Sequence, residues 1–389
     1  MWIQLSETLY DILREYQKEA VEIFLQRKKG IIVLPTGTGK TYVAISALQR
    51  LKNEGLVDTY IVTVPTISLA LQWERVLRES GIPARAYVSA KRAVSKTAAT
   101  IFPYPTFIKL AKTKAKQTEL IPTKTFLIID EAHHTHKGTK LYDAVLNFNA
   151  EYIMGLTATV SKKETYPLPI IFQKTYGELR KFIPEVELYE VDVEPSAEFM
   201  QVYRALTNAI KNAVKKLDNP KLSEKEIRHY YNVYTRSIGK RHTLVATNND
   251  IINKTVMITG LLEGKTLVFT LRIEAIKMLT KGIEKFGKKV IPILSATDIR
   301  KLRTTPWDVI IAAKRLGEGV DLPEVDNIVL SSYPAQLRTI IQEVGRGMRG
   351  GKGKTLSIFA LVIKDTYMVN AVNKLAEFLG IKIPSKIEI

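Results

Sequence analysis

The sequence predicts an α/β protein with two parallel-sheet domains and a helical insert between them. Three observations lead to this class. Apolar segments of strand length alternate with helical stretches, a glycine-rich loop follows an early apolar segment, and the chain has 389 residues. Such alternation is typical of parallel sheets covered by helices on both faces, and this length exceeds one ordinary core. We therefore expect a first domain at 1–194, an insert at 195–262 and a second domain at 263–389.

The first domain should begin with a short entry segment and a helix from Tyr16 to about Gln26. Its strands should be the apolar segments that follow Gly30. These segments lie at 31–34, 60–64, 85–88, 126–129, 152–155 and 186–191.

The region 195–262 differs from the sequence on either side. It has helical periodicity, few strand-like segments, and polar breaks at Asn219-Pro220 and at Asn248-Asn249-Asp250, so we expect helices there. Strand–helix alternation then resumes, and residues 365–389 should form a closing helix and tail. The strands expected in the second domain lie at 266–270, 289–293, 308–312, 327–331 and 355–362.

The composition excludes several classes of protein. No apolar run reaches about 18 residues, so we expect no membrane-spanning helix and no membrane partner. Met1-Trp2-Ile3-Gln4 lacks the basic-then-apolar pattern of a signal peptide, and the absence of cysteine removes disulfides and thiolate chemistry. These features favour a cytoplasmic protein. Three histidines crowd at His133, His134 and His136, where a metal site is a less simple interpretation than the carboxylate chemistry described below.

The charge points to a polyanionic partner. The formal net charge is +19 and the isoelectric point is near 9.7. Nucleic acid is the simplest partner for such an excess, although a lysine-rich surface that favours solubility would look the same.

The segment Pro35-Thr36-Gly37-Thr38-Gly39-Lys40-Thr41 predicts a phosphate-binding loop. It follows the apolar run 31–34 and precedes a helical stretch. Glycines let backbone N–H groups face a phosphate, the lysine reaches the β- and γ-phosphates, and the threonine hydroxyl ligates Mg²⁺. The full pattern begins with a glycine where this chain has Leu34. ATP and Mg²⁺ are therefore the expected cofactors.

A second motif supplies acidic groups. Asp130 and Glu131 follow the apolar segment 126–129. At the end of a strand, Asp130 can hold Mg²⁺ and Glu131 can orient or deprotonate the attacking water. A solvated acidic turn is the alternative. Together the two motifs, in this order, indicate hydrolysis of a nucleoside triphosphate.

Weaker signals surround these motifs in the first half of the chain. Gln17 carries an amide that can recognise an adenine edge, and Arg14 could stack on the base, although both also suit an ordinary start of a helix. Thr66 follows a strand, where it can cap a helix or contact a strand phosphate. Thr157-Ala158-Thr159 follows another strand and could relay between the nucleotide and the second domain, or form a structural turn.

The second half offers hydroxyl groups, an acidic turn and two arginines. Thr270 ends a strand, as do Ser295 and Thr297, and Gly319 and Asp321 lie in an acidic turn. In Gln342…Arg346…Arg349 the two arginines would share one helix face. Such guanidinium groups can stabilise charge on a γ-phosphate. Contact with phosphate backbones is the alternative.

This ordered set of motifs resembles the helicase superfamily 2 core in its DEAH form, over about residues 12–365. The closest likeness is to XPB-like, Hef-like and UvsW-like DNA helicases, on Leu13-Arg14-Glu15-Tyr16-Gln17 and Leu34-Pro35-Thr36-Gly37. The resemblance implies two RecA-like domains with ATP between them, stepping 3′ to 5′ along DNA in repair, replication or recombination.

The resemblance also implies roles for individual residues. Catalysis would involve Lys40, Asp130, Glu131, His133, Arg346 and Arg349, with Thr41 and Asp130 as metal ligands. The nucleotide would be bound by Arg14, Gln17, Pro35, Thr36, Gly37, Thr38, Gly39, Lys40, Thr41, Gly319, Asp321 and Gln342. The nucleic acid would be contacted by Thr66, Thr100, Thr270, Lys314 and Arg315.

Two departures from the family pattern leave details open. Ala313 stands where the family often has threonine, and no Arg-Glu-Asp triplet of the XPB type is present. DNA as a single strand, fork or branched duplex is the expected partner, and a monomer is favoured. The alternatives are an RNA-directed enzyme, a duplex translocase that does not separate strands, and a motor subunit with a partner nuclease.

Two segments of the chain are rich in basic residues, one in the insert and one in the first domain. In and just after the segment 226–236, apolar or aromatic residues recur at helical spacing, which favours a core for the insert. They are Ile227, Tyr230 or Tyr231, Tyr234 and Ile238. The functional alternative places Arg228, Arg236, Lys240 and Arg241 on duplex phosphates. A second basic run comprises Lys91, Arg92, Lys96, Lys109, Lys112, Lys114 and Lys116, as either a solvated surface or a contact with nucleic acid.

Overall fold

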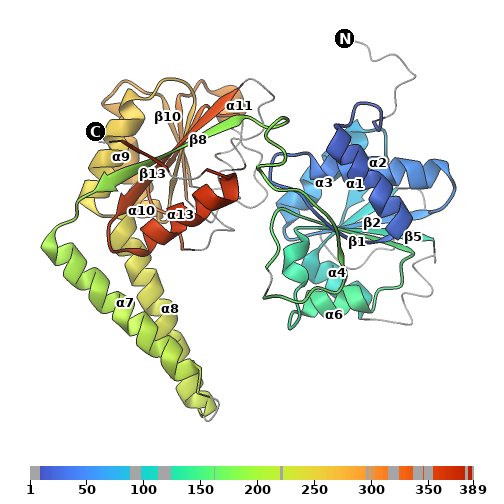
Figure 1. Cartoon of the computed structure of the whole chain (residues 1–389), viewed down its shortest axis with the longest axis horizontal. Coiled ribbons are helices and arrows are strands. Elements are labelled where there is room, and N and C mark those ends of the chain that lie inside the picture. The colour runs from blue at the N-terminus through green and yellow to red at the C-terminus, as the bar shows by residue number, and fades with distance from the viewer. Residues whose placement is uncertain are drawn as a thin grey trace. The chain divides into compact units, whose positions relative to one another are not determined.

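The computed structural model describes residues 9–87, 98–112, 124–161, 163–219, 222–294, 298, 301–313, 324–335, 345, 354–381 and 384–387 (Figure 1). The chain forms two compact units, and the boundary between them falls between Ile183 and Pro184. Each unit is built on one seven-stranded sheet. The predicted α/β class with two parallel sheets is confirmed.

The sheet of the first unit has the order β3-β4-β2-β5-β6-β1-β7, and every pairing in it is parallel. Its strands are β1 (Lys29–Val33), β2 (Thr59–Val64), β3 (Ala84–Ala86), β4 (Ala99–Pro103), β5 (Thr125–Asp130), β6 (Tyr152–Thr157) and β7 (Ile170–Gln173). Because all strands are parallel, their carboxyl ends meet at one edge of the sheet.

Two hydrophobic cores cover the two faces of this sheet, because successive side chains of a strand alternate between faces. Ile32 joins one core and its neighbour Ile31 joins the other. The first core receives α1 (Glu15–Arg27), α2 (Lys40–Asn53) and α3 (Ile67–Glu79). The second receives α4 (Tyr104–Ala111), the 3₁₀ turn η1 (Ala132–Thr135) and α6 (Lys140–Leu146).

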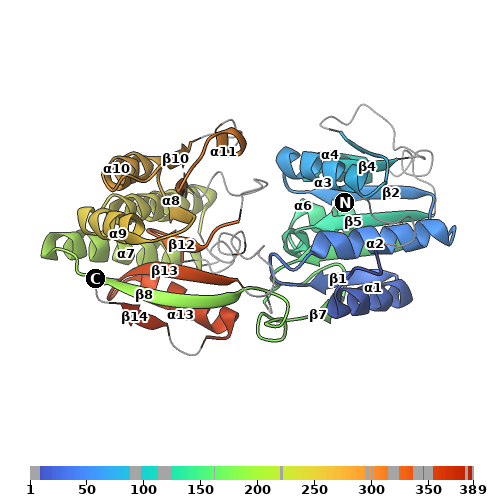
Figure 2. The same cartoon turned by 90° about the horizontal axis from the view of Figure 1, so that it is seen from above.

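The second unit has a sheet of order β10-β11-β9-β12-β13-β8-β14, again wholly parallel (Figure 2). Its strands are β8 (Glu185–Val193), β9 (Thr266–Thr270), β10 (Val290–Ile293), β11 (Val309–Ala313), β12 (Asn327–Leu330), β13 (Thr355–Ile363) and β14 (Ser385–Ile387). Helices α9 (Asn249–Leu261), α10 (Ile273–Glu284) and α13 (Tyr367–Leu379) pack on it, and a short helix, α11 (Lys301–Thr304), precedes β11.

Helices α7 (Ala197–Leu217) and α8 (Glu224–Ala246) form a hairpin that extends away from this sheet (Figure 1). Its base is fixed to the unit by Arg241. The Arg241 guanidinium carbon lies 5.7 Å from the ring centre of Tyr203 and 4.9 Å from that of Tyr367, and its Nη1 donates to Thr207 Oγ1 at 3.3 Å. Arg241 therefore anchors the hairpin, and these contacts favour a structural role over the alternative of a contact with duplex phosphates.

The structure corrects the position of the first boundary. Residues 186–191 were expected in the first sheet, but they form β8, which pairs with β13 and β14 in the second sheet. The boundary therefore lies ahead of 184 rather than at 194. The insert is also shorter than 195–262, because α9 packs on α10 and the sheet instead of extending the hairpin.

Three short strands have no counterpart in the sequence prediction. β7 and β14 are edge strands of the two sheets, and β4 ends in Pro103. The expected apolar stripe of the insert is not a buried core. Ile227 is 46% exposed and Tyr231 is 58% exposed, because a two-helix hairpin offers only one covered face. Within the described residues, we find no helix that has the length and apolar character needed to cross a membrane.

We predict that Gly155→Ala destabilises the first unit by about 1–3 kcal/mol, the usual cost of overpacking. A Cβ at Gly155 would lie 2.9 Å from the Cβ of Ala132 and 3.0 Å from Cγ1 of Ile31, and neither neighbour is the end of a flexible side chain. Thermal melting should show the loss. Gly177→Ala is the matched control, since a Cβ there meets only Thr175 Oγ1 at 3.9 Å. Equal melting temperatures for the two variants would contradict the prediction.

Candidate active site

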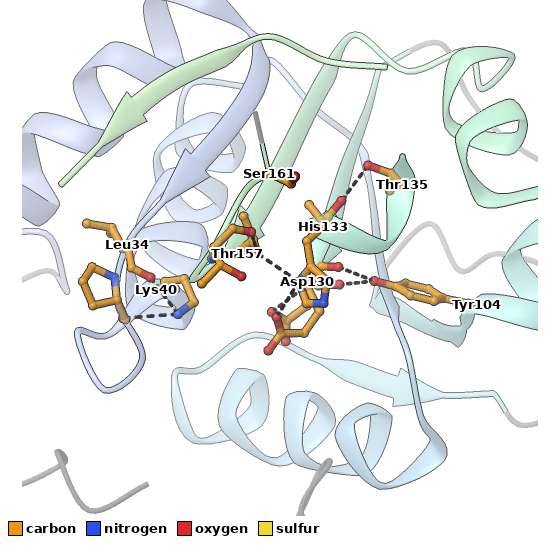
Figure 3. Close-up of polar contacts among 12 residues, drawn as sticks. Leu34, Lys40, Tyr104, Asp130, His133, Thr135, Thr157 and Ser161 are labelled. Carbon is orange, nitrogen blue, oxygen red and sulfur yellow. Dashed lines mark hydrogen bonds and ion pairs between the residues drawn. The ribbon is translucent and has the colours of Figure 1, made fainter. Parts of the chain in front are cut away.

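The carboxyl edge of the first sheet brings the predicted motifs together. β5, β6 and β1 are neighbours in the sheet, so Asp130 at the end of β5, Thr157 at the end of β6 and Leu34 after β1 lie side by side (Figure 3). Leu34 N donates to Thr157 O at 3.0 Å and fixes the start of the loop. These three positions form the frame of the site.

The loop at 35–41 has the backbone that a phosphate site requires. Gly37 and Gly39 have φ of 81° and 78°, a conformation that favours glycine. Gly39 is the N-cap of α2, so the open N–H groups of the helix begin beside the loop. Inside the loop, Thr38 Oγ1 donates to Pro35 O at 2.6 Å.

The Lys40 side chain folds back onto the start of this loop. Its ammonium donates to Leu34 O at 3.0 Å and to Pro35 O at 3.3 Å. Burial lowers the pKa of Lys40, and the charges of Glu131 and Asp130 partly oppose that shift. The ammonium therefore faces both carboxylates across the site and has no carboxylate hydrogen bond of its own among the described contacts.

Three side chains outside the loop brace its backbone. Tyr16 OH and Gln17 Nε2 both donate to Thr38 O, at 2.8 and 2.9 Å. Tyr176 OH donates to Thr36 O at 3.1 Å. A Cβ at Gly39 would lie 2.4 Å from Gln17 Nε2, so the glycine is also needed for this close approach.

The residues predicted to recognise adenine make contacts with the protein. Gln17 is buried, and its Oε1 accepts Arg14 N at 2.8 Å. The Arg14 guanidinium donates to Phe182 O, and it lies 3.5 Å from Tyr16 OH. Gln17 thus links α1 to the phosphate loop, and its recognition of adenine remains a prediction.

The carboxylate of Asp130 is fixed by two donors. Trp73 Nε1 donates to Oδ2 at 2.8 Å, and Glu131 N donates to Oδ1 at 2.9 Å. Burial, and then the neighbouring charge of Glu131, raise the pKa of Asp130 to about 6. One strong cation nearby would stabilise the ionised form, which is the role expected of a metal ligand.

Glu131 occupies a left-handed backbone conformation, with φ 53° and ψ 46°, which is uncommon for a residue with a side chain. Tyr104 OH donates to the carbonyls of both Asp130 and Glu131 and so braces this turn (Figure 3). Burial raises the pKa of the Glu131 carboxyl, but the hydrogen bond to His133 and the charge of Lys40 outweigh it and lower the pKa overall. Glu131 is therefore ionised, as a base must be.

His133 connects two strand ends. Its Nδ1 lies 3.2 Å from Glu131 Oε2 and 3.0 Å from Thr157 Oγ1, and its side chain is 3% exposed (Figure 3). Thr157 Oγ1 in turn donates to Thr159 O at 3.1 Å. The segment predicted as a relay is thus in contact with the predicted base through one imidazole.

The threonines predicted to contact nucleic acid lie in three different settings. Thr66 is partly exposed and caps α3, accepting Leu69 N at 3.2 Å. Thr270 ends β9 with its hydroxyl 3.0 Å from Ser332 Oγ. Thr100 is fully buried at the beginning of β4, away from the carboxyl edge, so its predicted contact is wrong for this conformation.

Seven predicted site residues lie outside the described part of the chain. They are Lys314, Arg315, Gly319, Asp321, Gln342, Arg346 and Arg349. Ser295 and Thr297 lie outside it too, as do Lys91, Arg92, Lys96, Lys114 and Lys116 of the basic run.

Sequence reasoning missed the aromatic residues of the site. Trp73, Tyr104 and Tyr176 each donate a hydrogen bond to the loop or to the acidic motif. Trp73 and Tyr176 have the spacing and burial of ordinary core residues. Tyr104 directly follows β4, a strand that was not predicted from the sequence, so no sequence signal pointed to it.

The residues present fit a magnesium–nucleotide complex. Thr36 Oγ1 is buried and has no hydrogen-bond partner, so the loop contains an orphaned polar group of the kind that a ligand satisfies. Thr41 and Asp130 supply hard oxygen donors, which suit Mg²⁺ when phosphate and water complete the coordination. Among the residues that the structure describes, no group of three or more His, Cys, Asp or Glu is arranged so that it could hold a metal ion.

Two protein families match successive parts of the chain. Residues 11–162 match the family described as "Type III restriction enzyme, res subunit". Residues 250–351 match "Helicase conserved C-terminal domain".

A relative covers nearly the whole chain. The "DNA 3'-5' translocase XPB2" of Sulfurisphaera tokodaii is 30% identical over an alignment 386 positions long, which covers 91% of this chain and 82% of the relative.

Solved structures share the fold. The helicase domain of Pyrococcus furiosus Hef aligns with a TM-score of 0.57 at 16% identity, over 93% of this chain and 98% of that one. The type ISP restriction-modification enzyme LlaBIII, solved bound to DNA, aligns with a TM-score of 0.63 at 18% identity. That alignment covers 94% of this chain but 30% of the much longer enzyme. The two sheets are therefore RecA-like, as predicted.

We predict that Asp130→Asn removes a pH-dependent cost of about 1–3 kcal/mol from the stability of the nucleotide-free and metal-free protein. It also adds a pH-independent loss, because the asparagine NH₂ cannot accept one of the two N–H groups that Asp130 accepts. The pKa of Asp130 is raised from 3.8 to about 6, so between these values the folded protein binds more protons than the unfolded chain. Stability therefore falls as the pH rises through this window, and the full cost is present above it. Asparagine carries no such cost.

Urea denaturation in EDTA checks this prediction. The stability of Asp130→Asn relative to the parent should be higher at about pH 7.5 than at about pH 4, because only the parent pays for ionisation of this carboxyl. A stability difference of the same size at both values would show that ionisation of Asp130 does not contribute to it.

Proposed function

The chain belongs to the superfamily 2 helicases, and we propose that it is an ATP-driven translocase that moves 3′ to 5′ on DNA. One observation carries this proposal. The phosphate loop, the pair Asp130–Glu131 and the relay His133–Thr157 occupy adjacent strand ends of one parallel sheet. Hydrogen bonds through His133 thus connect the predicted catalytic base Glu131 to Thr157, the residue predicted to relay between the nucleotide and the second domain. DNA as the track is suggested by the translocase relative.

In this proposal each site residue of the first unit has a separate role. The α2 N-terminus and Lys40 hold the phosphates, while Thr41 and Asp130 hold the metal. When bound, Mg²⁺ neutralises phosphate charge and favours attack on the γ-phosphorus. Glu131 accepts a proton from the attacking water, since its carboxylate is ionised and a quarter exposed.

The second unit would complete the site. Arg346 and Arg349 would act as arginine fingers, with Gly319, Asp321 and Gln342 near the phosphates and ribose. Strand contacts would come from Thr66, Thr270, Lys314 and Arg315. Family resemblance supports these roles, and it also supports a place in DNA repair, replication or recombination.

His133 would couple the hydrogen bonding of Glu131 to the elements that bind the nucleic acid strand. Its imidazole contacts both Glu131 and Thr157, so a shift of either strand end changes the hydrogen bond that Glu131 makes. A bound nucleic acid strand could thereby release Glu131 toward the water. This arrangement accounts for the expected stimulation of ATP hydrolysis by nucleic acid.

The α7–α8 hairpin is the proposed contact for duplex DNA ahead of the motor. Among its described residues, eight exposed lysines and arginines face four exposed acids, Glu198, Asp218, Glu224 and Glu226, an excess that suits a surface that follows phosphates. The exposed basic residues are Arg204, Lys211, Lys215, Lys216, Lys225, Arg228, Arg236 and Lys240. The partly exposed Tyr234 and exposed Tyr231 lie among them, where a base at a fork could stack.

A second candidate function is a motor within a restriction system. The match of residues 11–162 to a restriction-enzyme subunit favours it, and a nuclease would then be a partner. A further alternative is translocation along duplex DNA without separation of its strands. A triplex-displacement assay, run beside a fork-unwinding assay, distinguishes this activity from unwinding. We favour a monomer in the cytoplasm.

We predict that Lys40→Ala and Glu131→Gln each abolish nucleic-acid-stimulated ATP hydrolysis, with a loss of more than about 100-fold. Glu131→Gln should still bind ATP, because the loop and Asp130 are intact. Steady-state phosphate release with single-stranded DNA, duplex DNA and RNA measures both the loss and the preferred nucleic acid. A fully active Glu131→Gln protein would remove the basis of the site. Arg346→Ala should bind ATP normally and turn it over slowly.

We predict that replacing Arg228, Arg236 and Lys240 together by Gln weakens binding to forked duplex DNA. Each lost phosphate contact should reduce the slope of log affinity against log salt by about 0.9. ATP hydrolysis on single-stranded DNA should be unchanged, because these residues lie on the hairpin and not on the sheet. Fluorescence anisotropy at several salt concentrations provides the measurement.

The control removes the same charge elsewhere in the second unit. Lys277, Lys281 and Lys285 are exposed along α10 and at its end. If their replacement by Gln changes the slope as much as the hairpin variant does, the hairpin is not a specific contact.

A further inference from the structure

Trp73 is a core residue whose hydrogen bond reaches the active site. The side chain lies on the buried face of α3 and is 2% exposed. Its indole nitrogen can only donate, and it donates to Asp130 Oδ2 at 2.8 Å. The partner is a carboxylate of the active site rather than a backbone carbonyl, so helix α3 and the metal-binding residue are directly joined.

The helix that carries Trp73 also reaches the predicted nucleic-acid side of the sheet. α3 follows β2, which is the neighbour of β5, and Thr66 caps its first turn. Near this end the side chains of Ile67 and Leu71 are also exposed, by 47% and 55%. One end of α3 is thus available to a ligand, while its buried face holds Asp130.

The carboxylate of Asp130 has little freedom to turn without breaking this contact. One oxygen accepts from Trp73 and the other accepts from Glu131 N. Each oxygen retains a second lone pair for water or a metal ion. Displacement of α3 along its axis would pull on one oxygen only and rotate the plane of the carboxylate.

We propose that Trp73 is a positioning residue whose indole N–H orients Asp130 for the magnesium–nucleotide complex and makes that orientation depend on the position of α3. Binding of a nucleic acid strand at the Thr66 end of α3 is then transmitted to Asp130 through this hydrogen bond. The inference rests on the proposed ATP-driven function. It adds a second connection between strand and nucleotide, separate from the path through His133 and Thr157.

The test variant is Trp73→Phe, which keeps an apolar ring in the core and removes the N–H donor. Affinity for a non-hydrolysable ATP analogue is measured by calorimetry with Mg²⁺ and with EDTA. In EDTA the variant should bind like the parent. With Mg²⁺ it should bind about tenfold more weakly, the effect expected when a ligand loses the partner that orients it. The stimulation of ATP hydrolysis by single-stranded DNA should fall toward none.

Trp307→Phe is the matched control. Trp307 is a buried tryptophan of the second unit whose ring lies under Lys265 Nζ at 4.5 Å, and it has no part in the site. This control should retain both the Mg²⁺-dependent affinity and the stimulation. If Trp73→Phe also retains both, the proposal is overturned.

A second measurement does not use substitution at Trp73. The chain has three tryptophans, so the double variant Trp2→Phe/Trp307→Phe reports Trp73 alone. Its fluorescence should change when an oligothymidine is added without nucleotide, because the strand moves α3 against Asp130. If the oligothymidine binds, as anisotropy shows, and the fluorescence stays constant, the transmission is refuted. If the parent protein shows no DNA-stimulated ATP hydrolysis at all, that result contradicts the proposed function and therefore also this inference, which rests on it.

Discussion

The site depends on the Lys40 ammonium and the carboxylates of Asp130 and Glu131, which the fold brings together in a largely buried position. Burial lowers the pKa of Lys40 and raises that of Asp130, so each group is costly alone and each favours the charged form of the other. A magnesium–nucleotide complex would relieve this cost by adding four phosphate charges and a divalent cation. The cluster is thus poised for its ligand, and the order β5-β6-β1 at one edge of a parallel sheet is what places it there.

Aromatic side chains hold this costly cluster in place. Tyr16 and Tyr176 fix carbonyls of the phosphate loop, Tyr104 fixes those of the acidic turn, and Trp73 fixes a carboxylate oxygen. A buried hydroxyl or indole N–H must find an acceptor, so each of these bonds serves packing and geometry together. Through them the site is connected to α1, α3 and α4, which gives a bound strand several ways to influence hydrolysis.

Much of this could be predicted from the sequence, for identifiable reasons. The loop 35–41 and the pair Asp130–Glu131 were found because glycines and adjacent carboxylates at strand ends have few other uses. The strand 186–191 was found but assigned to the wrong sheet, since a continuous apolar pattern does not say which strand is its neighbour. The role of Trp73 could not be predicted, because its hydrogen bond depends on a contact between segments that are distant in sequence. Thr100 was placed on the nucleic acid by resemblance, and burial at the start of β4 contradicts it.

The central claim is that ATP hydrolysis at this site drives directed movement along one DNA strand. Streptavidin displacement tests it most directly, with biotin at either the 5′ or the 3′ end of a single-stranded oligonucleotide. The account predicts ATP-dependent displacement from the 5′ end, where a 3′-to-5′ motor arrives, and none from the 3′ end. Displacement from the 3′ end alone would contradict the direction, and ATP hydrolysis with no displacement from either end would contradict the motor itself.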